Sequence, residues 1–513
     1  MEDPSMSVNQ PDTEQRRHHL SAPLIVAANN NEARGNTRRR PQSVAFVKAS
    51  SARHRRRTDS SSVAFSRSHR FSSSILLPAS STTTDTTDTT DQQPIVPGEL
   101  SPTSVSINLI KCAVGAGSFS LPSAFLKAGF WAGIILCCTL GLLASFTVHL
   151  LTTVERRLAS EVGHRLRYPD LALLAFNDWR GKALRYLCLF GVMSTSLGVC
   201  AVYVIFISSQ LQEIVAGLAS TNTLEVAFML SPFIVGLALL RSFKYLVFTS
   251  ILGDVAVLVG LVGTLYIGVS NGITATPFDY STTNHTSLEH LPAVNWSTLP
   301  EAAGSIAFLF CIHVVVLPVS QSLRGDTVQS QQRNFQCVTG TSYFVITVAN
   351  CLFGAVSVCL FGLETQGNVL KNLALGGTYP TLVLVIRVLL CIDLLFTIPM
   401  ILAAGREIVE DAAVETSCGR KHTSAARNVT RIALVGIIFL IVATVPDFMD
   451  AVSLVGGFAN SLMGLILPPL LAYYVMTPNG GWGRWLFAVM ISTIGSVLLV
   501  SSTYFTIKGI VEK

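Results

Sequence analysis

Residues 108 to 122 read Asn108-Leu-Ile-Lys-Cys-Ala-Val-Gly-Ala-Gly-Ser-Phe-Ser-Leu-Pro122. Two glycines, two serines and a proline fall within the last eight of these residues. Such residues are poor material for a continuous helix, so we predict an interrupted helix that lines a cavity. The half-helix beginning near Ser118 would point its positive end at an anionic group. Small residues also allow helices to pack closely, which is the alternative interpretation.

The surrounding sequence predicts an all-α polytopic membrane protein. Of its 513 residues, 50% are hydrophobic and only 13% are charged, against about 25% in ordinary globular proteins. Apolar runs long enough to cross a bilayer recur along the chain. We expect eleven transmembrane helices, at roughly 104–126, 129–153, 184–212, 225–240, 243–270, 301–321, 335–362, 377–405, 429–446, 450–475 and 484–507.

The chain divides into a polar tail, residues 1–100, and a transmembrane domain, residues 101–513. The tail is rich in Ser, Thr, Asp, Gln and Arg and lacks a hydrophobic period, so we expect it to be disordered. Its arginine clusters at 38–40 and 55–57 suit a solvated cytosolic tether, an anionic lipid surface, or a cytosolic kinase or signalling partner. The tail holds thirteen Arg and Lys against ten Asp and Glu, so we expect no nucleic-acid partner.

The charges of the loops predict the orientation. Seventeen Arg and Lys fall on the tail's side of the eleven spans and four on the other side. By the positive-inside rule, the N-terminus is cytosolic and the C-terminus is extracellular or lumenal. Two glycosylation sequons, at Asn284 and Asn295, lie in the longest loop of the outer side. The charges do not distinguish the plasma membrane from a vacuolar or lysosomal membrane.

The sixth span offers a second candidate interruption, between Gly304 and Pro318. It contains His313, an ionisable group near mid-membrane, which is either functional or bonded to a neighbouring carbonyl. Spans one and six are five apart, as an inverted five-helix repeat requires of its two broken helices.

Four ordered motifs resemble the amino acid/auxin permease family. They are the segment Asn108–Pro122, followed by Ala128-Gly129; His313-Val-Val-Val-Leu-Pro318; Leu360-Phe-Gly362 with Val369-Leu-Lys-Asn-Leu373; and Phe396-Thr-Ile-Pro399 with Arg406-Glu-Ile-Val-Glu410. The resemblance covers residues 100–507. It implies eleven helices, a cytosolic N-terminus, a leucine-transporter-type core with an inverted repeat, and secondary transport of amino acids.

The charges inside the spans are candidates for ion coupling. Lys111 lies one helical turn before Gly115, and we expect either Asp393 or Asp254 to be its partner. By resemblance, Lys111 and Thr397 flank the position of a sodium ion in the leucine-transporter fold. Lys111 resembles the proton-coupled members, whereas Asn108 resembles the sodium-coupled members. We therefore expect H⁺ or Na⁺ as coupling ion, with H⁺ favoured, and neither a cofactor nor a bound metal.

The substrate site is expected at the two interruptions. Backbone amides from Gly115, Ala116, Gly117 and Ser118 would hold an amino-acid carboxylate, and carbonyls from Phe308 to Cys311 would receive the ammonium, near His313. Phe308 or Phe310 would face a neutral side chain. An amino-acid sensor signalling through its tail is the alternative function. An enzyme is not expected, because His313 has no partner at nucleophile–base spacing.

Overall fold

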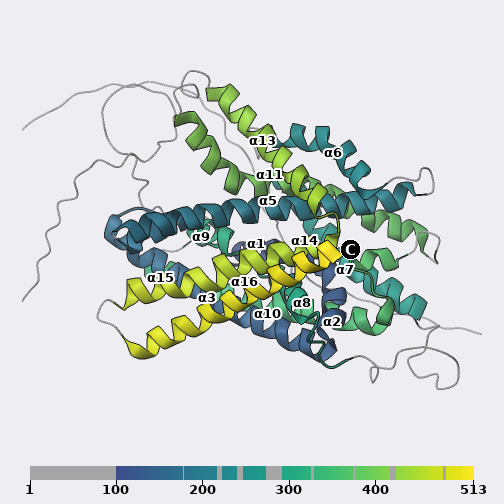
Figure 1. Ribbon diagram of the computed structural model, residues 1–513, viewed down its shortest axis with the longest axis horizontal. Coiled ribbons are helices and arrows are strands. Elements are labelled where there is room, and N and C mark those ends of the chain that lie inside the picture. Colours follow the sequence, from purple (N-terminus) through teal and green to yellow (C-terminus); the bar gives the residue numbers. More distant parts are fainter. Residues whose placement is uncertain are drawn as a thin grey trace, which may run out of the picture. The chain divides into compact units, whose positions relative to one another are not determined.

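The computed structural model describes residues 100–176, 178–216, 222–239, 246–272, 292–324, 328–373, 377, 379–415, 423–477 and 481–512. All of them fall in one compact unit, Leu76–Lys513. Every named element in these residues is a helix (Figure 1), and one isolated bridge pairs Leu100 with Leu323. The expected tail, up to residue 99, and the sequon at Asn284 lie outside the described residues.

The longer helices are α1 (Pro102–Ala113), α2 (Leu121–Ala128), α3 (Phe130–Val162), α4 (Tyr168–Ala175), α5 (Trp179–Val215), α6 (Thr223–Ala238), α7 (Leu246–Gly272), α8 (Leu299–Phe308), α9 (His313–Ser322), α10 (Val328–Phe361), α11 (Pro380–Glu415), α13 (Thr423–Thr444), α14 (Phe448–Val455), α15 (Leu467–Met476) and α16 (Trp482–Glu512). Short 3₁₀ turns form η1 (Ala116–Ser120), η3 (Gly362–Glu364) and η4 (Val369–Asn372), and η5 (Gly456–Ile466) is a π-helix.

The eleven expected spans all have a counterpart among the described residues. Nine helices there are long and apolar enough to cross a membrane, and the bent pair Pro102–Ala113 and Ala116–Ala128 makes a tenth. Helix α6 takes the place of the expected fourth span. With 16 residues it is shorter than each of these candidate spans.

The first span is broken, as predicted. Helix α1 ends at Ala113, Val114 and Gly115 are extended, and the chain resumes as η1 and α2 with a bend of 43°. The sixth span is also divided: α8 ends at Phe308 and α9 begins at His313, although the two halves remain close enough in direction to form one span. At both interruptions the backbone leaves the α conformation while the sequence on either side stays hydrophobic. Each break therefore separates two apolar half-helices.

The long helices pack around these two broken spans. Figure 1 shows α5 running lengthwise with α11 and α13 beside it, and both of these helices pack against α5. Helix α10 packs on α3 and α1, and α16 packs on η5 and α8. The apolar residues of η1, such as Phe119, join the core around α5 and α11, whereas Ala113 and Leu121, on either side, join the core around α3 and α10. The break therefore lies where two parts of the core meet.

The C-terminal end of the first span is closed by a tight turn. Gly129 has a φ of +92°, which disfavours any residue with a side chain, and a Cβ there would lie 2.7 Å from the carbonyl oxygen of Ala293. The amide of Asn295 donates to the carbonyl of Ala128 at 2.9 Å. The segment that carries the second sequon is therefore fastened to the end of α2.

Candidate functional site

The first interruption exposes backbone amides at the start of η1. The amide of Ser118 donates to the carbonyl of Gly115 at 3.0 Å, which is the first bond of this 3₁₀ turn. The amides of Gly115, Ala116 and Gly117 precede that bond and have no acceptor within the turn. They are three of the four donors expected to hold a carboxylate; the fourth, the amide of Ser118, is already bonded to the carbonyl of Gly115. A helix start of this kind favours an anion.

Phe308, the last residue of α8, faces this turn. A Cβ added to Gly117 would lie 2.6 Å from Cδ1 and 2.9 Å from Cε1 of Phe308, which is closer than carbon atoms approach in folded proteins. The ring is partly buried, so it packs on the first break while keeping some accessible surface. The structure thus brings together two of the predicted substrate residues, one from each broken span.

The backbone amides of the second interruption are all bonded locally. The amides of residues 309 to 312 donate, in order, to the carbonyls of Ile306, Ala307, Phe308 and Phe310, at 3.3, 3.1, 3.2 and 2.9 Å. Phe310 itself is fully buried and stacks on Tyr343 with ring centroids 6.4 Å apart. Of the two predicted aromatic residues, Phe308 lies against the first break, while Phe310 packs toward α3 and α10.

His313 lies at the start of α9 and is almost fully buried. Its Nε2 is 2.9 Å from the hydroxyl oxygen of Thr147 on α3. On the other side, a Cβ on Gly464 of η5 would lie 2.8 Å from Cε1 of the ring. His313 therefore joins the second broken span to α3 and to the π-helix.

Two residues that the sequence analysis did not single out lie next to the first break. The hydroxyl of Ser118 donates to Oδ1 of Asn350 on α10 at 2.9 Å, and Nδ2 of Asn350 is buried with no partner. The hydroxyl oxygen of Tyr203 on α5 lies 3.9 Å from the place a Cβ would take on Gly115. A single amide within an apolar run is the signal for Asn350, whereas no local pattern indicates Tyr203.

The charged residues of the spans gather beside the same break. Nζ of Lys111 on α1 lies 3.2 Å from Oδ1 of Asp254 on α7, and 21% and 36% of their side chains are exposed. Asp393 on α11 is 9% exposed and packs against Gly253, where a Cβ would collide with its carboxylate. Lys111 and Asp254 both act electrostatically on Asp393.

The cluster thus contains one lysine and two carboxylates from three helices. The sequence left open whether Asp254 or Asp393 is the ion partner of Lys111. In the structure the partner is Asp254. The hydroxyl of Thr397 donates to the carbonyl of Asp393 at 2.8 Å, and Asn108 lies exposed on α1, one turn before Lys111. Among the described residues, no group of three or more His, Cys, Asp or Glu is arranged to hold a metal ion.

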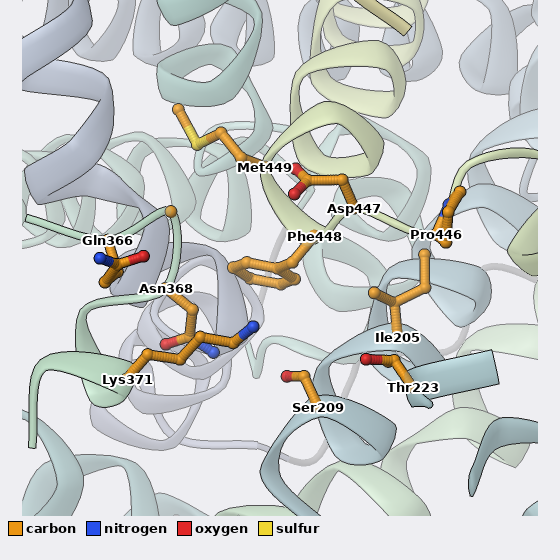
Figure 2. A pocket seen from close by; sticks show the side chains of 11 residues that line it. Ile205, Ser209, Thr223, Gln366, Asn368, Lys371, Pro446, Asp447, Phe448 and Met449 are labelled. Atoms are coloured by element: carbon orange, nitrogen blue, oxygen red, sulfur yellow. The ribbon is translucent and has the colours of Figure 1, made fainter. Parts of the chain in front are cut away.

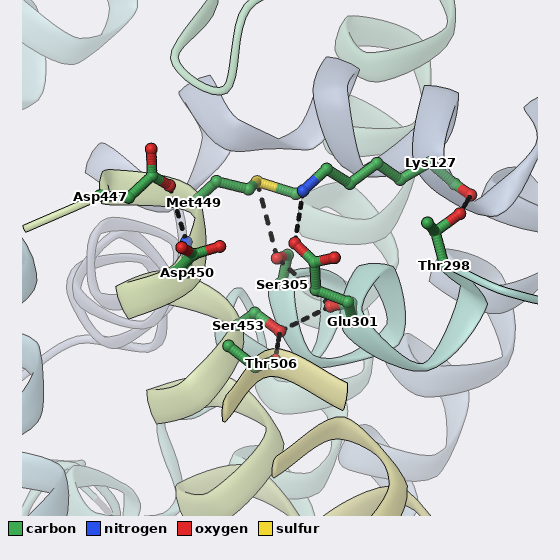
Figure 3. Close-up of polar contacts among 9 residues, drawn as sticks. All are labelled: Lys127, Thr298, Glu301, Ser305, Asp447, Met449, Asp450, Ser453 and Thr506. Atoms are coloured by element: carbon green, nitrogen blue, oxygen red, sulfur yellow. Dashed lines mark hydrogen bonds and ion pairs between the residues drawn. The ribbon is translucent and has the colours of Figure 1, made fainter. Parts of the chain in front are cut away.

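The second half-helix of the first broken span, α2, is tied to the first half-helix of the sixth span, α8. Lys127 at the end of α2 forms an ion pair with Glu301 at the start of α8 (Figure 3). The carbonyl of Glu301 accepts a hydrogen bond from Ser453 of α14 at 2.7 Å, and Ser453 is 2.9 Å from the hydroxyl of Thr506 on α16. These contacts connect α2, α8, α14 and α16 into one polar network.

Two broken helices five spans apart define a class of membrane-protein fold, and comparison with solved structures agrees on this fold. The chain is similar to the inward-facing conformation of Mhp1, with a TM-score of 0.53 and 14% identity, over 82% of this chain and 92% of that one. This likeness shows the fold, which is the leucine-transporter-type inverted repeat expected from the sequence.

The sequence comparisons identify the family. Residues 98–508 match the family described as transmembrane amino acid transporter protein, so the chain belongs to that family. It is 25% identical to the proton-coupled amino acid transporter-like protein pathetic of Drosophila melanogaster, over 79% of this chain and 84% of that protein. It is also 25% identical to the amino acid transporter ANT1 of Arabidopsis thaliana, over 79% and 91%. The protein is a multi-pass membrane protein of this amino acid transporter family.

Proposed function

We propose that this protein is a secondary active symporter of neutral amino acids that is driven by protons. Its family and fold support amino-acid transport. The observation that carries the proposal is the ion pair between Lys111 and Asp254. Lys111 lies one helical turn before Gly115, so the pair places titratable groups next to the turn that is proposed to bind the substrate.

In this proposal the substrate lies between the two broken spans. The amides of Gly115, Ala116 and Gly117 hold the carboxylate, and carbonyls of the 308–311 segment receive the ammonium. The ring of Phe308 packs on the substrate side chain. The residues around Gly117 and Phe308 are apolar or uncharged, which favours a neutral side chain over a charged one.

The ion pair provides a route for coupling. An ammonium in the position of Lys111 supplies the positive charge that a sodium ion would otherwise supply. Asp254 and Asp393 are two carboxylates near one lysine, so a shift of the lysine between them during the transport cycle changes which carboxylate is stabilised as the anion. Each cycle would then bind and release one proton.

The orientation follows from the charges of the loops, with the N-terminus in the cytosol and the C-terminus outside or in a lumen. The membrane is either the plasma membrane or a vacuolar or lysosomal one. Asn284 and Asn295 are proposed glycosylation sites on the outer side.

The test is uptake of labelled neutral amino acids by proteoliposomes, with the pH gradient and the sodium gradient imposed separately. Proton coupling predicts accumulation above equilibrium with a pH gradient in sodium-free buffer. Accumulation that follows only the sodium gradient would overturn the proton assignment. Absence of transport of any amino acid, by folded protein, would overturn the proposed function.

A further inference from the structure

Two cysteines from distant parts of the chain touch each other at the surface of the helix bundle. The Sγ atoms of Cys138 on α3 and Cys351 on α10 are 3.7 Å apart. Both thiols are free, and Cys138 is exposed while Cys351 is half-buried. Cys137, which precedes Cys138, is fully buried, and its thiol also interacts with that of Cys351. We call Cys138 and Cys351 the thiol pair.

The position of the thiol pair follows from a close crossing of α3 and α10. A Cβ on Gly141 of α3 would collide with the hydroxyl of Thr347 on α10, so the missing side chain lets the two helices approach. Gly141 lies three residues after Cys138, and Thr347 lies four residues before Cys351. Residues with these spacings share one face of a helix. The thiol pair therefore occupies the next turn of the same crossing.

The thiol pair faces the acyl chains of the bilayer. Ile135 and Leu142 on α3, and Phe344 and Val348 on α10, lie three, four or seven residues from the two cysteines, and all four side chains are exposed. Cys138 is eight residues beyond the start of α3, which is about 12 Å along the helix. The hydrocarbon core of a bilayer is about 30 Å thick. Oxidants dissolved in the lipid are therefore the ones that reach this pair.

A lipid hydroperoxide supplies the chemistry that two such thiols allow. The outer peroxide oxygen is transferred to Sγ of Cys138: the O–O bond breaks, an S–O bond forms, and the thiol proton moves to the departing alkoxide. The products are a sulfenic acid and a lipid alcohol. Sγ of Cys351 then attacks the sulfenic sulfur, so that an S–S bond forms and the hydroxyl leaves as water with the proton of Cys351. The two thiols lose two electrons, which reduce the hydroperoxide.

A link between α3 and α10 constrains the second half of the first broken span. Phe125 of α2 packs on a glycine of each helix. A Cβ on Gly133 of α3 would lie 2.8 Å from Cγ of this ring, and a Cβ on Gly354 of α10 would lie 3.1 Å from its Cε2. Gly133 is five residues from Cys138, and Gly354 is three residues from Cys351. A disulfide therefore fixes the spacing of α3 and α10 next to the ring of Phe125.

We propose that the thiol pair is an oxidation site for lipid hydroperoxides, and that its disulfide blocks transport by holding α2 between α3 and α10. The blocking step rests on the proposed function, because it requires α2 to move when substrate is transported. The oxidation step is independent of that function. A small dithiol reduces the disulfide and releases α2, so the modification is reversible.

The first measurement detects the disulfide directly. Purified full-length protein is reconstituted in phosphatidylcholine vesicles, with and without linoleic acid hydroperoxide in the bilayer. Free thiols are then alkylated, and tandem mass spectrometry assigns the linked residues. Wild type is expected to link Cys138 to Cys351, and Cys137→Ala should give the same link. Hydrogen peroxide added to the water at the same concentration should form the link more slowly, because it partitions poorly into hydrocarbon.

The second measurement is the initial uptake of a labelled neutral amino acid by the same vesicles. Before oxidation, Cys138→Ala and Cys351→Ala should take up substrate at the wild-type rate. After hydroperoxide treatment, wild type is expected to lose most of its uptake and to regain it with dithiothreitol, whereas both variants keep theirs. Cys359→Ala removes another exposed thiol of α10, and Cys112→Ala removes the exposed thiol next to Lys111. Both control variants should stay as sensitive as wild type.

The outcomes separate this inference from the proposed function. Oxidation that leaves the thiol pair unlinked, or that links Cys137 instead of Cys138, would overturn the site. A complete link with unchanged uptake would overturn the block, and so would an equal loss of uptake by oxidised Cys138→Ala. Absence of uptake before oxidation would contradict the proposed function, while the mass spectra would still decide whether the oxidation site exists.

Discussion

The ring of Phe308 lies directly against Gly117, so that the end of one broken helix fills the space where the other has no side chain. A Cβ at Gly117 would lie 2.6 Å from Cδ1 of that ring. Each half of the proposed substrate site therefore constrains the other: the glycine permits the close approach, and the ring covers the turn that the glycine forms. A larger residue at position 117 would therefore force the Phe308 ring to move.

Gly117→Ala is expected to lower amino-acid uptake at least tenfold. The added methyl group forces the Phe308 ring to move, and overpacking of this kind costs about 1–3 kcal/mol. The double change Gly117→Ala with Phe308→Leu should recover part of the uptake, because the smaller side chain leaves room for the methyl group. Initial uptake rates, normalised to the amount of protein in the membrane, are the measurement.

Gly436→Ala on α13 is the matched control, since a Cβ there meets no atom within 4 Å. Its uptake should equal that of wild type. Normal uptake by Gly117→Ala would contradict a substrate site at the broken helix.

The sequence predicts these two interruptions because they have local causes. Glycine, serine and proline disturb a helix wherever it packs, so the break near Gly115 could be read from the residues alone. Helix rotation has no such local signal. Whether Lys111 faces Asp254 or Asp393, and whether Phe308 or Phe310 faces the first break, depends on how α7, α8 and α11 are turned in the bundle.

The lack of a local signal for helix packing also explains why the sequence analysis missed two residues of the site. Asn350 lies on α10 and Tyr203 on α5, far from Gly115 and Ser118 in the sequence, and only the packing of α5 and α10 against the first broken span brings them to the turn. The pocket that Lys371, Phe448 and Asp447 help to line (Figure 2) could not be predicted either, because its lining comes from separate parts of the chain.

Lys111→Met is expected to abolish accumulation driven by a pH gradient. The change leaves Asp254 without its ion partner and removes the charge that, in the proposed mechanism, alternates between the two carboxylates. Exchange of labelled for unlabelled amino acid, which needs no net proton movement, should persist to a greater extent than accumulation. Both activities are measured in the same proteoliposomes.

The double variant Lys111→Met with Asp254→Leu separates coupling from a structural ion pair. A structural pair predicts that removing both charges restores folding and full accumulation. Coupling predicts a variant that folds and binds substrate but does not concentrate it. Lys111→Met with Asp393→Leu is the parallel variant that tests the second carboxylate. Full accumulation driven by pH in both double variants would rule out a coupling role for Lys111.

Asn350→Leu is expected to weaken substrate binding, because it removes the acceptor that orients the Ser118 hydroxyl. The hydrogen bond is buried, and such bonds contribute about 1 kcal/mol. In a double-mutant cycle, Asn350→Leu and Ser118→Ala should therefore show a coupling energy of about 1 kcal/mol for substrate affinity. Ser330→Ala at the exposed start of α10 is the control. Additive effects of the two changes would show that this bond does not organise the site.

Deletion of residues 2–95 is expected to leave uptake unchanged. The region matching the transporter family begins at residue 98, and the junction is held by Leu100, whose amide donates to the carbonyl of Ser322 at 2.9 Å and whose carbonyl accepts from Arg324 at 2.8 Å. Deletion of residues 2–103 is the contrasting variant. It removes these two bonds and the Ser101 cap of α1, and a lost cap alone costs about 1 kcal/mol, so it should unfold at a lower temperature. Uptake per molecule and thermal unfolding of both deletions are the measurements.

A sensor that signals through its tail would lose its output in the shorter deletion while still binding amino acid. Loss of uptake by that same variant, with normal thermal stability, would instead assign the tail a direct part in transport.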